Sequence, residues 1–254
     1  MHRAVDGKSE VITATEVTAG EVNEAQRLSF LLDQHEETTD EKVETVVADS
    51  KYGTVENYLS CHDRQINAHI PDLKETQKSR RLDIFPEDAF KYDTDSDTYT
   101  CPAGKTLTRR KHKKKRQAYE YSCSKKECQA CNLYDQCTKS KTGRTIKRHY
   151  RHEELQSMRE RTKTKVAKRD INIRQHLMER SFARATRYGY KKSRWRLLWR
   201  NRIQEYLTAT VQNIMVLAYQ GINNRKMAAC RMGVDDVMYR TSFYFLKNYR
   251  YSCC

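Results

Sequence analysis

The sequence contains little glycine and proline: its 254 residues include 8 Gly and 3 Pro. This scarcity excludes collagen-like chains and Pro/Gly-rich low-complexity chains. No apolar run reaches the length of about 18 residues that a membrane span needs, and the opening residues MHRAVDGKSE contain no apolar signal segment. The sequence therefore indicates neither a membrane protein nor secretion, and we expect the protein to work in a reducing cytosol.

Charge is abundant and unevenly distributed. The chain carries 49 Lys+Arg against 33 Asp+Glu, a net charge of +16 with a mean hydropathy of −0.95. Residues 1–60 hold 5 Lys/Arg and 13 Asp/Glu, whereas the other residues hold 44 and 20. A basic surface gains affinity for a polyanion because Lys and Arg release counterions from phosphates. A solvated surface is the alternative, and a pI near 9.4 favours nucleic acid over it.

The first residues have the pattern of a compact α/β unit. Two short strands, His2–Val5 and Val11–Val17, are predicted around a hairpin turn at Asp6, because the Asp-Gly dipeptide tolerates positive φ values. A capping box at Thr18 predicts a helix that runs to about Gln34.

The segment VVADSKYG, residues 46–53, places an acid at the end of a β-branched apolar run that is typical of a buried strand. Ligands of α/β sheets bind at the carboxyl ends of strands, and Mg²⁺ prefers carboxylate oxygens, so Asp49 is a candidate metal ligand. A capping or turn role before Tyr52 is the alternative. A short helix over Thr54–Ser60 and a strand over Asn67–Pro71 are predicted next.

The later chain changes character twice. Residues 74–147 are charged, aromatic and Cys-bearing, which indicates an inserted subdomain, and residues 152–187 return to a helical pattern. We expect the helix to bury a stripe made of Ile171, Gln175, Met178, Phe182 and Ala185. A last helix over about 201–219 presents one apolar face, made of Ile203, Leu207, Val211, Ile214 and Leu217. The predicted domains are 1–73 and 148–220 for the core, 74–147 for the insert and 221–254 for a basic aromatic tail.

Glu179 lies at the edge of the predicted stripe, next to Met178. It can complete a metal site while neighbouring guanidinium groups contact phosphates; these belong to Arg174, Arg180, Arg184 and Arg187. An exposed helix with i, i+4 ion pairs is the alternative, and charge pattern alone favours it. Basic residues then alternate with Tyr188, Tyr190, Trp195 and Trp199, a pattern typical of surfaces that stack on unpaired bases, although packing on the core is open for some of these rings.

Nine cysteines in a cytosolic protein argue against a disulfide framework. Four thiolates suit tetrahedral Zn²⁺, and the candidates, with Cys123 as a spare, are Cys101, Cys128, Cys131 and Cys137. Free or redox-labile thiols are equally compatible with this spacing. The run Arg109–Arg116 holds seven Lys/Arg in eight residues, and like-charge repulsion predicts a flexible phosphate-contacting loop.

These segments together resemble the C-terminal part of a bacterial insertion-sequence transposase of the DDE class. The likeness rests on VVADSKYG, CPAGKTL with the Cys cluster, MERSFARATRYGYKKSRWR and TATVQNIMVLAY, and covers residues 2–220. It implies a ribonuclease-H-like α/β fold, a mixed sheet with flanking helices, interrupted by the Cys-rich basic insert. Three acids of that family hold two Mg²⁺ for DNA strand cleavage and transfer; Asp49 matches the second and Glu179 the third. The four cysteines are also a family feature.

The resemblance has two departures. The first acid lies on a strand that precedes the hairpin, so we expect an N-terminally truncated, impaired enzyme, and Asp6 has the context of a turn residue instead. Thr186 stands where relatives usually have Lys, with Arg187 beside it as a phosphate contact.

The resemblance also implies partners. These are the inverted repeats at transposon ends and target DNA, in the cytoplasm of a bacterium at its nucleoid. The expected DNA-binding residues are Arg180, Arg184, Arg187, Lys191, Lys192, Arg194 and Trp195. A homodimer is compatible with the sequence, which does not determine the oligomeric state. The alternatives are a noncatalytic DNA-binding fragment that acts as an inhibitor or remnant of the full transposase, and an unrelated zinc-dependent nucleic-acid-binding module.

Overall fold

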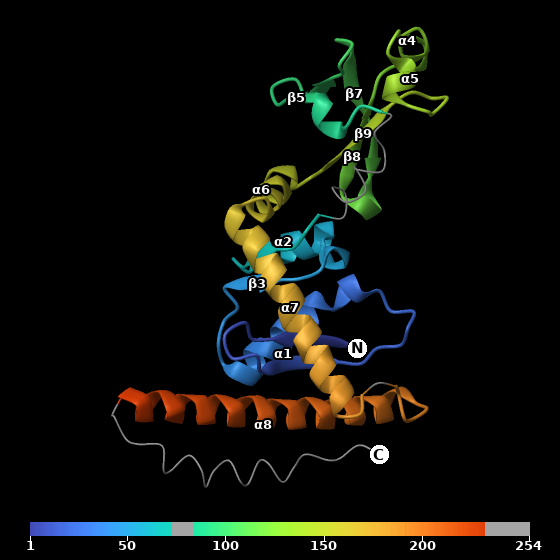
Figure 1. Ribbon diagram of the computed structural model, residues 1–254. Coiled ribbons are helices and arrows are strands. Elements are labelled where there is room, and N and C mark those ends of the chain that lie inside the picture. Colours follow the sequence, from blue (N-terminus) through green and yellow to red (C-terminus); the bar gives the residue numbers. More distant parts are fainter. Residues whose placement is uncertain (73–83, 191, 232–254) are drawn as a thin grey trace. The chain divides into compact units, whose positions relative to one another are not determined.

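The computed structural model describes residues 1–72, 84–190 and 192–231, with side chains as far as residue 222. The chain has a mixed α/β fold and divides into two compact units (Figure 1). One unit combines Met1–Ala19 with the chain from Leu177 onward, and the other comprises Gly20–His176. No helix of the described residues is long and apolar enough to cross a membrane.

The discontinuous unit contains the predicted hairpin. Strand β1 (His2–Val5) pairs antiparallel with β2 (Ile12–Glu16), as the sequence predicts. The turn differs from the Asp-Gly expectation, because the left-handed residue is Glu10, with φ of 58°. Asp6 serves the turn through its side chain: its Oδ2 accepts hydrogen bonds from the backbone N–H and the hydroxyl of Ser9, each 2.6 Å long.

Two long helices complete this unit. Helix α7 (Lys165–Arg187) belongs to it from Leu177 onward, and α8 (Leu198–Arg231) packs against β2. Asn213 Oδ1 accepts the Ile12 N–H, and Asn213 Nδ2 donates to the Ile12 carbonyl, both at 2.8 Å. The side chain therefore satisfies backbone groups of β2 as a neighbouring strand would.

The polar side of α8 is the buried side, which corrects the predicted packing. Glu205 is fully buried and accepts Arg3 Nε at 2.5 Å, Arg3 Nη2 at 3.0 Å and Thr15 Oγ1 at 2.7 Å. Gln212 is fully buried too, and its Oε1 accepts Arg3 Nη1 at 3.2 Å. The guanidinium on β1 requires this arrangement, because a buried charge needs paired and hydrogen-bonded neighbours. The apolar face that was expected to be buried is exposed instead.

The buried stripe of α7 is also displaced from the expected one. Gln175 is exposed and Phe182 is 38% exposed, whereas Leu177 and Ser181, outside the predicted stripe, are buried. Ala185 is buried as predicted. Arg3 explains the rotation, because its guanidinium reaches the Ser181 hydroxyl at 3.4 Å and lies 5.6 Å from the centre of the Phe182 ring.

The unit Gly20–His176 has a helical and a sheet-based core. Asn23, and not Thr18, provides the side-chain cap, and it caps the short helix η1 (Glu24–Arg27). Helix α1 (Leu28–Thr39) follows η1, so it begins later than predicted, and it ends at Asp40, whose backbone is left-handed. Strand β3 (Thr45–Val47) pairs in parallel with β4 (Asn67–His69). Between them lie η2 (Ser50–Tyr52) and α2 (Val55–Asp63), which Thr54 caps. Strand β3 is half-buried and not fully buried, since it has a single neighbour.

This helical core contains α1, α2, β4 and α6 (His152–Thr162). Its fully buried side chains include Tyr58, Ile70 and Met158, and the Tyr58 hydroxyl donates to the Ile70 carbonyl at 2.6 Å. Helices α6 and α7 confirm the helical pattern of residues 152–187, with an interruption at residues 163–164.

Five antiparallel strands in sequential order build the second core: β5 (Lys91–Asp93), β6 (Thr98–Thr100), β7 (Thr106–Lys113), β8 (Ala118–Ser122) and β9 (Thr145–His149). Short helical turns accompany them: η3 (Glu87–Ala89), η4 (Lys114–Arg116), α4 (Lys125–Gln129) and α5 (Tyr134–Cys137). In the described residues, the strands form this sheet and the two separate two-stranded pairs β1-β2 and β3-β4.

The basic run is part of this sheet, so the flexible loop expected for Arg109–Arg116 is wrong. Residues of the run up to Lys113 lie in β7 and the last three form η4. Cross-strand neighbours explain why the repulsion is tolerated: Arg109 Cζ lies 4.5 Å from the centre of the Tyr119 ring and its Nη1 lies 3.1 Å from Asp97 Oδ2. Such contacts stabilise a charged strand without burying its charges.

Candidate nucleic-acid and metal sites

Asp49 lies two residues after the end of β3, at the carboxyl edge of the parallel pair β3-β4. It occupies the N-cap position of η2, but its side chain caps no backbone N–H. The carboxylate is exposed and accepts the Ser50 hydroxyl at 3.0 Å. The side chain therefore does not cap η2, whereas a turn role remains compatible with the structure, because the Asp49 carbonyl accepts the Tyr52 N–H at 2.9 Å. The exposed carboxylate oxygens are accessible to a metal ion.

Glu179 is exposed on α7 and belongs to the other unit. The helix fixes its direction, because the buried side chains before and after it, Leu177 and Ser181, lie on the opposite side. Thr186, seven residues later, donates its hydroxyl to the Phe182 carbonyl at 3.0 Å. Each unit thus provides one of the two candidate acids.

Two of the expected DNA-binding residues share a partner that the sequence did not indicate. Arg180 Nη2 and Arg184 Nη1 each lie 2.7 Å from a different carboxylate oxygen of Glu10. Burial acts to raise the pKa of Glu10, but the hydrogen bonds from Arg184 and Arg180 outweigh it and lower the pKa. A carboxylate held between two guanidinium groups has the position and charge that a phosphate group would take. The sequence does not indicate this role of Glu10, because glutamate rarely adopts the left-handed backbone conformation that Glu10 has.

The basic aromatic segment after α7 is exposed. Arg187, Lys192 and Arg194 are exposed, Trp195 is 52% exposed and Trp199 is 55% exposed, whereas Lys191 lies outside the described residues. The segment is anchored to α8: Gln204 Oε1 accepts the Arg194 N–H at 3.1 Å, and Asn201 Nδ2 donates to the Trp195 carbonyl at 3.0 Å. Anchored indole rings beside cations can stack on bases without first being ordered.

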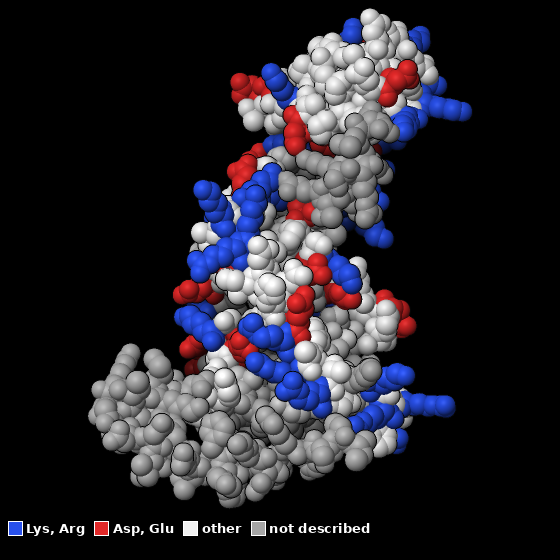
Figure 2. All heavy atoms as spheres, in the orientation of Figure 1, with Lys and Arg blue, Asp and Glu red and all other residues white. Residues whose placement is uncertain are grey.

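Lys and Arg are also prominent elsewhere. Figure 2 shows them over the part of the visible face that α6 and α7 occupy in Figure 1, with Asp and Glu among them. The mixture of signs means that exposure alone does not select a nucleic-acid surface. The segment that combines cations with exposed indole rings is therefore the stronger candidate.

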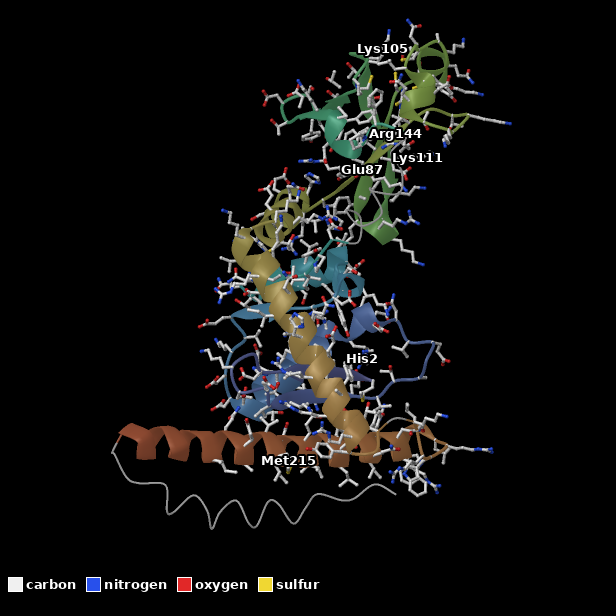
Figure 3. All side chains as sticks on the ribbon, in the orientation of Figure 1. His2, Glu87, Lys105, Lys111, Arg144 and Met215 are labelled. Carbon is white, nitrogen blue, oxygen red and sulfur yellow. The ribbon has the colours of Figure 1, made fainter. Side chains whose placement is uncertain are left out.

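Five cysteines line one cavity of the five-stranded sheet's core, between Lys105 and Arg144 as labelled in Figure 3. All five are free and half-buried, and they are Cys101, Cys123, Cys128, Cys131 and Cys137. The Cys123 thiol donates to Glu127 Oε2 at 2.9 Å, and burial together with this bond raises its pKa to about 12. Cys123 is thereby set apart from the four candidate zinc ligands.

The loops around those four have the features of thiolate sites. Gly104, at φ of 75°, closes a tight turn in which the Lys105 N–H donates to Cys101 Sγ at 3.3 Å. Gly143, at φ of 92°, lies so close to Cys128 that an added Cβ would be 2.9 Å from its Sγ. Among the described residues no three of these sulfurs are all within 4.8 Å of one another, whereas Zn–S bonds of 2.3 Å place thiolates about 3.8 Å apart. The donor set fits Zn²⁺, and binding would require the loops to draw together.

A third cluster was not predicted from the sequence. His62, Asp63 and Glu154 offer ligand atoms within 4.8 Å of one another. The Arg151 guanidinium already occupies the space between the acids, with Nη1 3.0 Å from Asp63 Oδ2 and Nε 2.6 Å from Glu154 Oε2. Arg151 lowers the pKa of Asp63 to about 2. A cation site is unfavourable here because the carboxylates are already neutralised, so the cluster joins α2 to α6 as an ion-pair network.

Comparison with known families addresses the later part of the chain. Residues 100–218 match the family model of the transposase DDE domain. The match covers somewhat less than half of the chain and includes the four candidate zinc ligands, Glu179 and the basic aromatic segment, whereas Asp49 lies before it. No match was found among curated proteins or among solved structures. The match supports a role in DNA transposition and, with it, DNA as a partner.

Proposed function

We propose that the protein acts as a DDE transposase of a bacterial insertion sequence, with Asp49 and Glu179 as ligands of Mg²⁺ in a ribonuclease-H-like core. The match over residues 100–218 carries this proposal, because it contains Glu179 and the cationic residues that follow it on α7. Asp49 supports it independently as an exposed carboxylate at a strand end.

The residues have distinct tasks in this proposal. Asp49 and Glu179 would hold the metal ions, and the ions would supply charge neutralisation at the phosphate that is cut. Arg180, Arg184 and Arg187 would bind neighbouring phosphates and keep the strand in line. Trp195 would stack on a base that has left the duplex, and the cations that precede it in the sequence, Lys191, Lys192 and Arg194, would bind phosphates.

The resemblance assigns a third acid to the metal site, and we assign no residue of this sequence to that position. The protein would work in the bacterial cytoplasm, at the nucleoid, where its substrate DNA is found.

The test is cleavage and joining of end-labelled DNA that carries terminal inverted repeats, with Mg²⁺ or with EDTA. Asp49→Asn and Glu179→Gln should each abolish any Mg²⁺-dependent product, whereas Glu41→Gln, at an exposed loop acid, should leave it unchanged. Product that persists in Asp49→Asn would contradict the metal assignment.

The alternative is a noncatalytic DNA-binding fragment that inhibits or is a remnant of the full transposase. The observation that favours it is the exposed cationic and aromatic segment after α7, which needs no metal ion to bind DNA. It predicts binding to inverted-repeat DNA that Asp49→Asn does not alter, and no cleavage in Mg²⁺. The same assay, run with a gel-shift measurement, distinguishes the two functions.

The cysteine cavity is proposed to hold one structural Zn²⁺ through Cys101, Cys128, Cys131 and Cys137. The N–H···S bond at Cys101 and the close approach of Gly143 to Cys128 support it. Metal analysis of protein purified without chelator should find about one zinc per chain, and Cys131→Ser should lose it. Cys123→Ser, in the same cavity, is the matched control and should retain zinc; less than about a tenth of an equivalent in the unaltered protein would count against the site.

A further inference from the structure

The densest run of positive charge in the chain has no role in the proposed function. Seven of the eight residues Arg109–Arg116 are Lys or Arg, and every residue from Thr108 to Gln117 is exposed. Strand β6 pairs with β7 only as far as Thr108, so among the described strands β8 is the one neighbour of the rest of β7. We call Arg109–Arg116 the basic edge, and Figure 3 labels Lys111 on it. Because successive side chains point to opposite faces, both faces and one side of this part of the strand are accessible to a partner.

Three aromatic rings order the basic edge. The ring centres of His112 on β7, Tyr119 on β8 and Tyr150, which follows β9, lie between 4.9 and 5.4 Å apart. The Arg109 guanidinium also lies on the Tyr119 ring. Because these rings contact one another, they fix a strand whose own charges repel, and they are not arranged as a free platform for unpaired bases. The cations are thus presented from a fixed backbone, which suits a regular partner such as a duplex.

Most cations of the basic edge have no acidic partner. Arg109 Nη1 lies 3.1 Å from Asp97 Oδ2, and Lys113 Nζ lies 4.0 Å from Glu120 Oε2. Within the described part of the chain, the other five form no ion pair: Arg110, Lys111, Lys114, Lys115 and Arg116. Exposed edge strands often carry Lys because a charge prevents pairing with another edge, but a single charge is enough for that purpose. Five unpaired cations therefore indicate a polyanion partner.

We infer that the basic edge is a second DNA contact, which binds the phosphate backbone of a duplex and does not read its sequence. Lys binds phosphate as a point charge, and the affinity comes from the release of counterions, so no contact with a base is needed. The basic edge belongs to the unit Gly20–His176, whereas Arg180, Arg184 and Trp195 belong to the other unit. Each unit therefore has a DNA contact of its own.

Duplex DNA is the polyanion that the observations favour. The basic edge lies within residues 100–218, which match the transposase DDE domain, so the choice of DNA rests on the proposed function. A membrane surface is a poorer partner, because no apolar side chain occurs from Thr108 to Gln117, and peripheral binding to lipid is stabilised by apolar side chains in addition to charge.

The experiment measures the binding of the full-length chain to a short duplex of random sequence by fluorescence anisotropy, over a series of salt concentrations. The variant combines Lys111→Gln, Lys114→Gln and Lys115→Gln. We expect the slope of log K against log salt concentration to decrease by about three, and the affinity at about 0.1 M salt to fall at least about tenfold. No Mg²⁺ is added, so a protein that fails to cleave inverted-repeat DNA can still show this contact, and the two proposals fail separately.

Two control variants separate a local contact from net charge. Lys125→Gln, Lys126→Gln and Lys141→Gln remove three exposed lysines of the same unit outside the basic edge, and together they should decrease the slope by less than about one. Replacement of the three edge lysines by Arg keeps the charge and should keep the binding. Equal slopes in the two Gln variants, loss of binding in the Arg variant, or tighter binding to single-stranded DNA or anionic lipid vesicles than to the duplex would each overturn the proposal.

A second measurement needs no variant. Bound duplex should slow the acetylation of Lys114 and Lys115 in the unaltered protein more than that of Lys125 and Lys126, as measured by mass spectrometry. The basic edge is shielded by the phosphates in this proposal, whereas the other two lysines stay accessible. Equal protection of both pairs would overturn it.

Discussion

The buried ion pair between Arg3 and Glu205 provides the sharpest test of the unit that contains α8. Both side chains are fully buried, and Glu205 accepts three hydrogen bonds from Arg3 and Thr15. Glu205→Ala would leave the guanidinium inside the unit with its strongest partner removed. Truncation of one member of a buried pair costs about 3–5 kcal/mol, and we expect a loss of that size in the free energy of unfolding.

The assay is urea unfolding followed by tryptophan emission. Both tryptophans, Trp195 and Trp199, lie in this unit, so their emission reports its unfolding. Glu179→Ala is the matched control, because it makes the same chemical change at an exposed helical site, and it should shift the free energy by less than about 0.5 kcal/mol.

A double variant separates the cost of an orphaned charge from the net value of the pair. Arg3→Met with Glu205→Leu removes both charges, and we expect it to be at least about 2 kcal/mol more stable than Glu205→Ala. If Glu205→Ala costs less than about 1 kcal/mol, or if the double variant is as unstable as the sum of the single variants, the buried pair does not organise this unit in the way described.

Three further outcomes are expected. Glu10→Gln should release two guanidinium groups and strengthen binding to DNA about tenfold at low salt, measured by fluorescence anisotropy. The slope of log K against log salt concentration should steepen by about one to two counterions, and an unchanged slope would contradict the phosphate-like role of the carboxylate. The pKa of Asp63 falls from 3.8 to about 2 on folding, so the stability that this carboxylate contributes is present above pH 3.8 and is lost as the pH falls towards 2. Between about pH 4 and 2, the Tm of Asp63→Asn should therefore decrease less than the Tm of the unaltered protein, as measured by thermal unfolding. Gly143→Ala should lower the zinc content and the Tm by more than Gly104→Ala, since both glycines have positive φ but a Cβ at Gly104 meets no atom within 4 Å.

Local patterns predicted nine of the twenty elements of the described residues, and none of the strands β5–β9. The hairpin, the strand before Asp49, the helix capped by Thr54 and the helices of residues 152–187 all form, because each is specified by neighbouring residues. The position of Asp49 at a strand end follows from the same local information. Its metal-ligand role stays a prediction.

Long-range pairing explains what the sequence did not predict. The orientation of α8 depends on Arg3, which is 202 residues away from Glu205, so the apolar stripe of the helix was a misleading guide to its buried side. The basic run folds as β7 because Asp97 and Tyr119 lie across from it, and repulsion within the run carries no information about those neighbours. Glu10 was missed for the same reason, since Arg180 is 170 residues along the chain.

The separation of Arg3 from Glu205 also sets the order of events on the ribosome. The hairpin β1-β2 is synthesised before α8, and its buried guanidinium finds its carboxylate only after another 202 residues have been added. At about 5–20 residues per second that interval is about 10–40 s, and an isolated two-stranded hairpin is marginally stable in water. These two strands therefore leave the exit tunnel well before they reach their final packing, and during this delay their unpaired edges are accessible to chaperones and proteases.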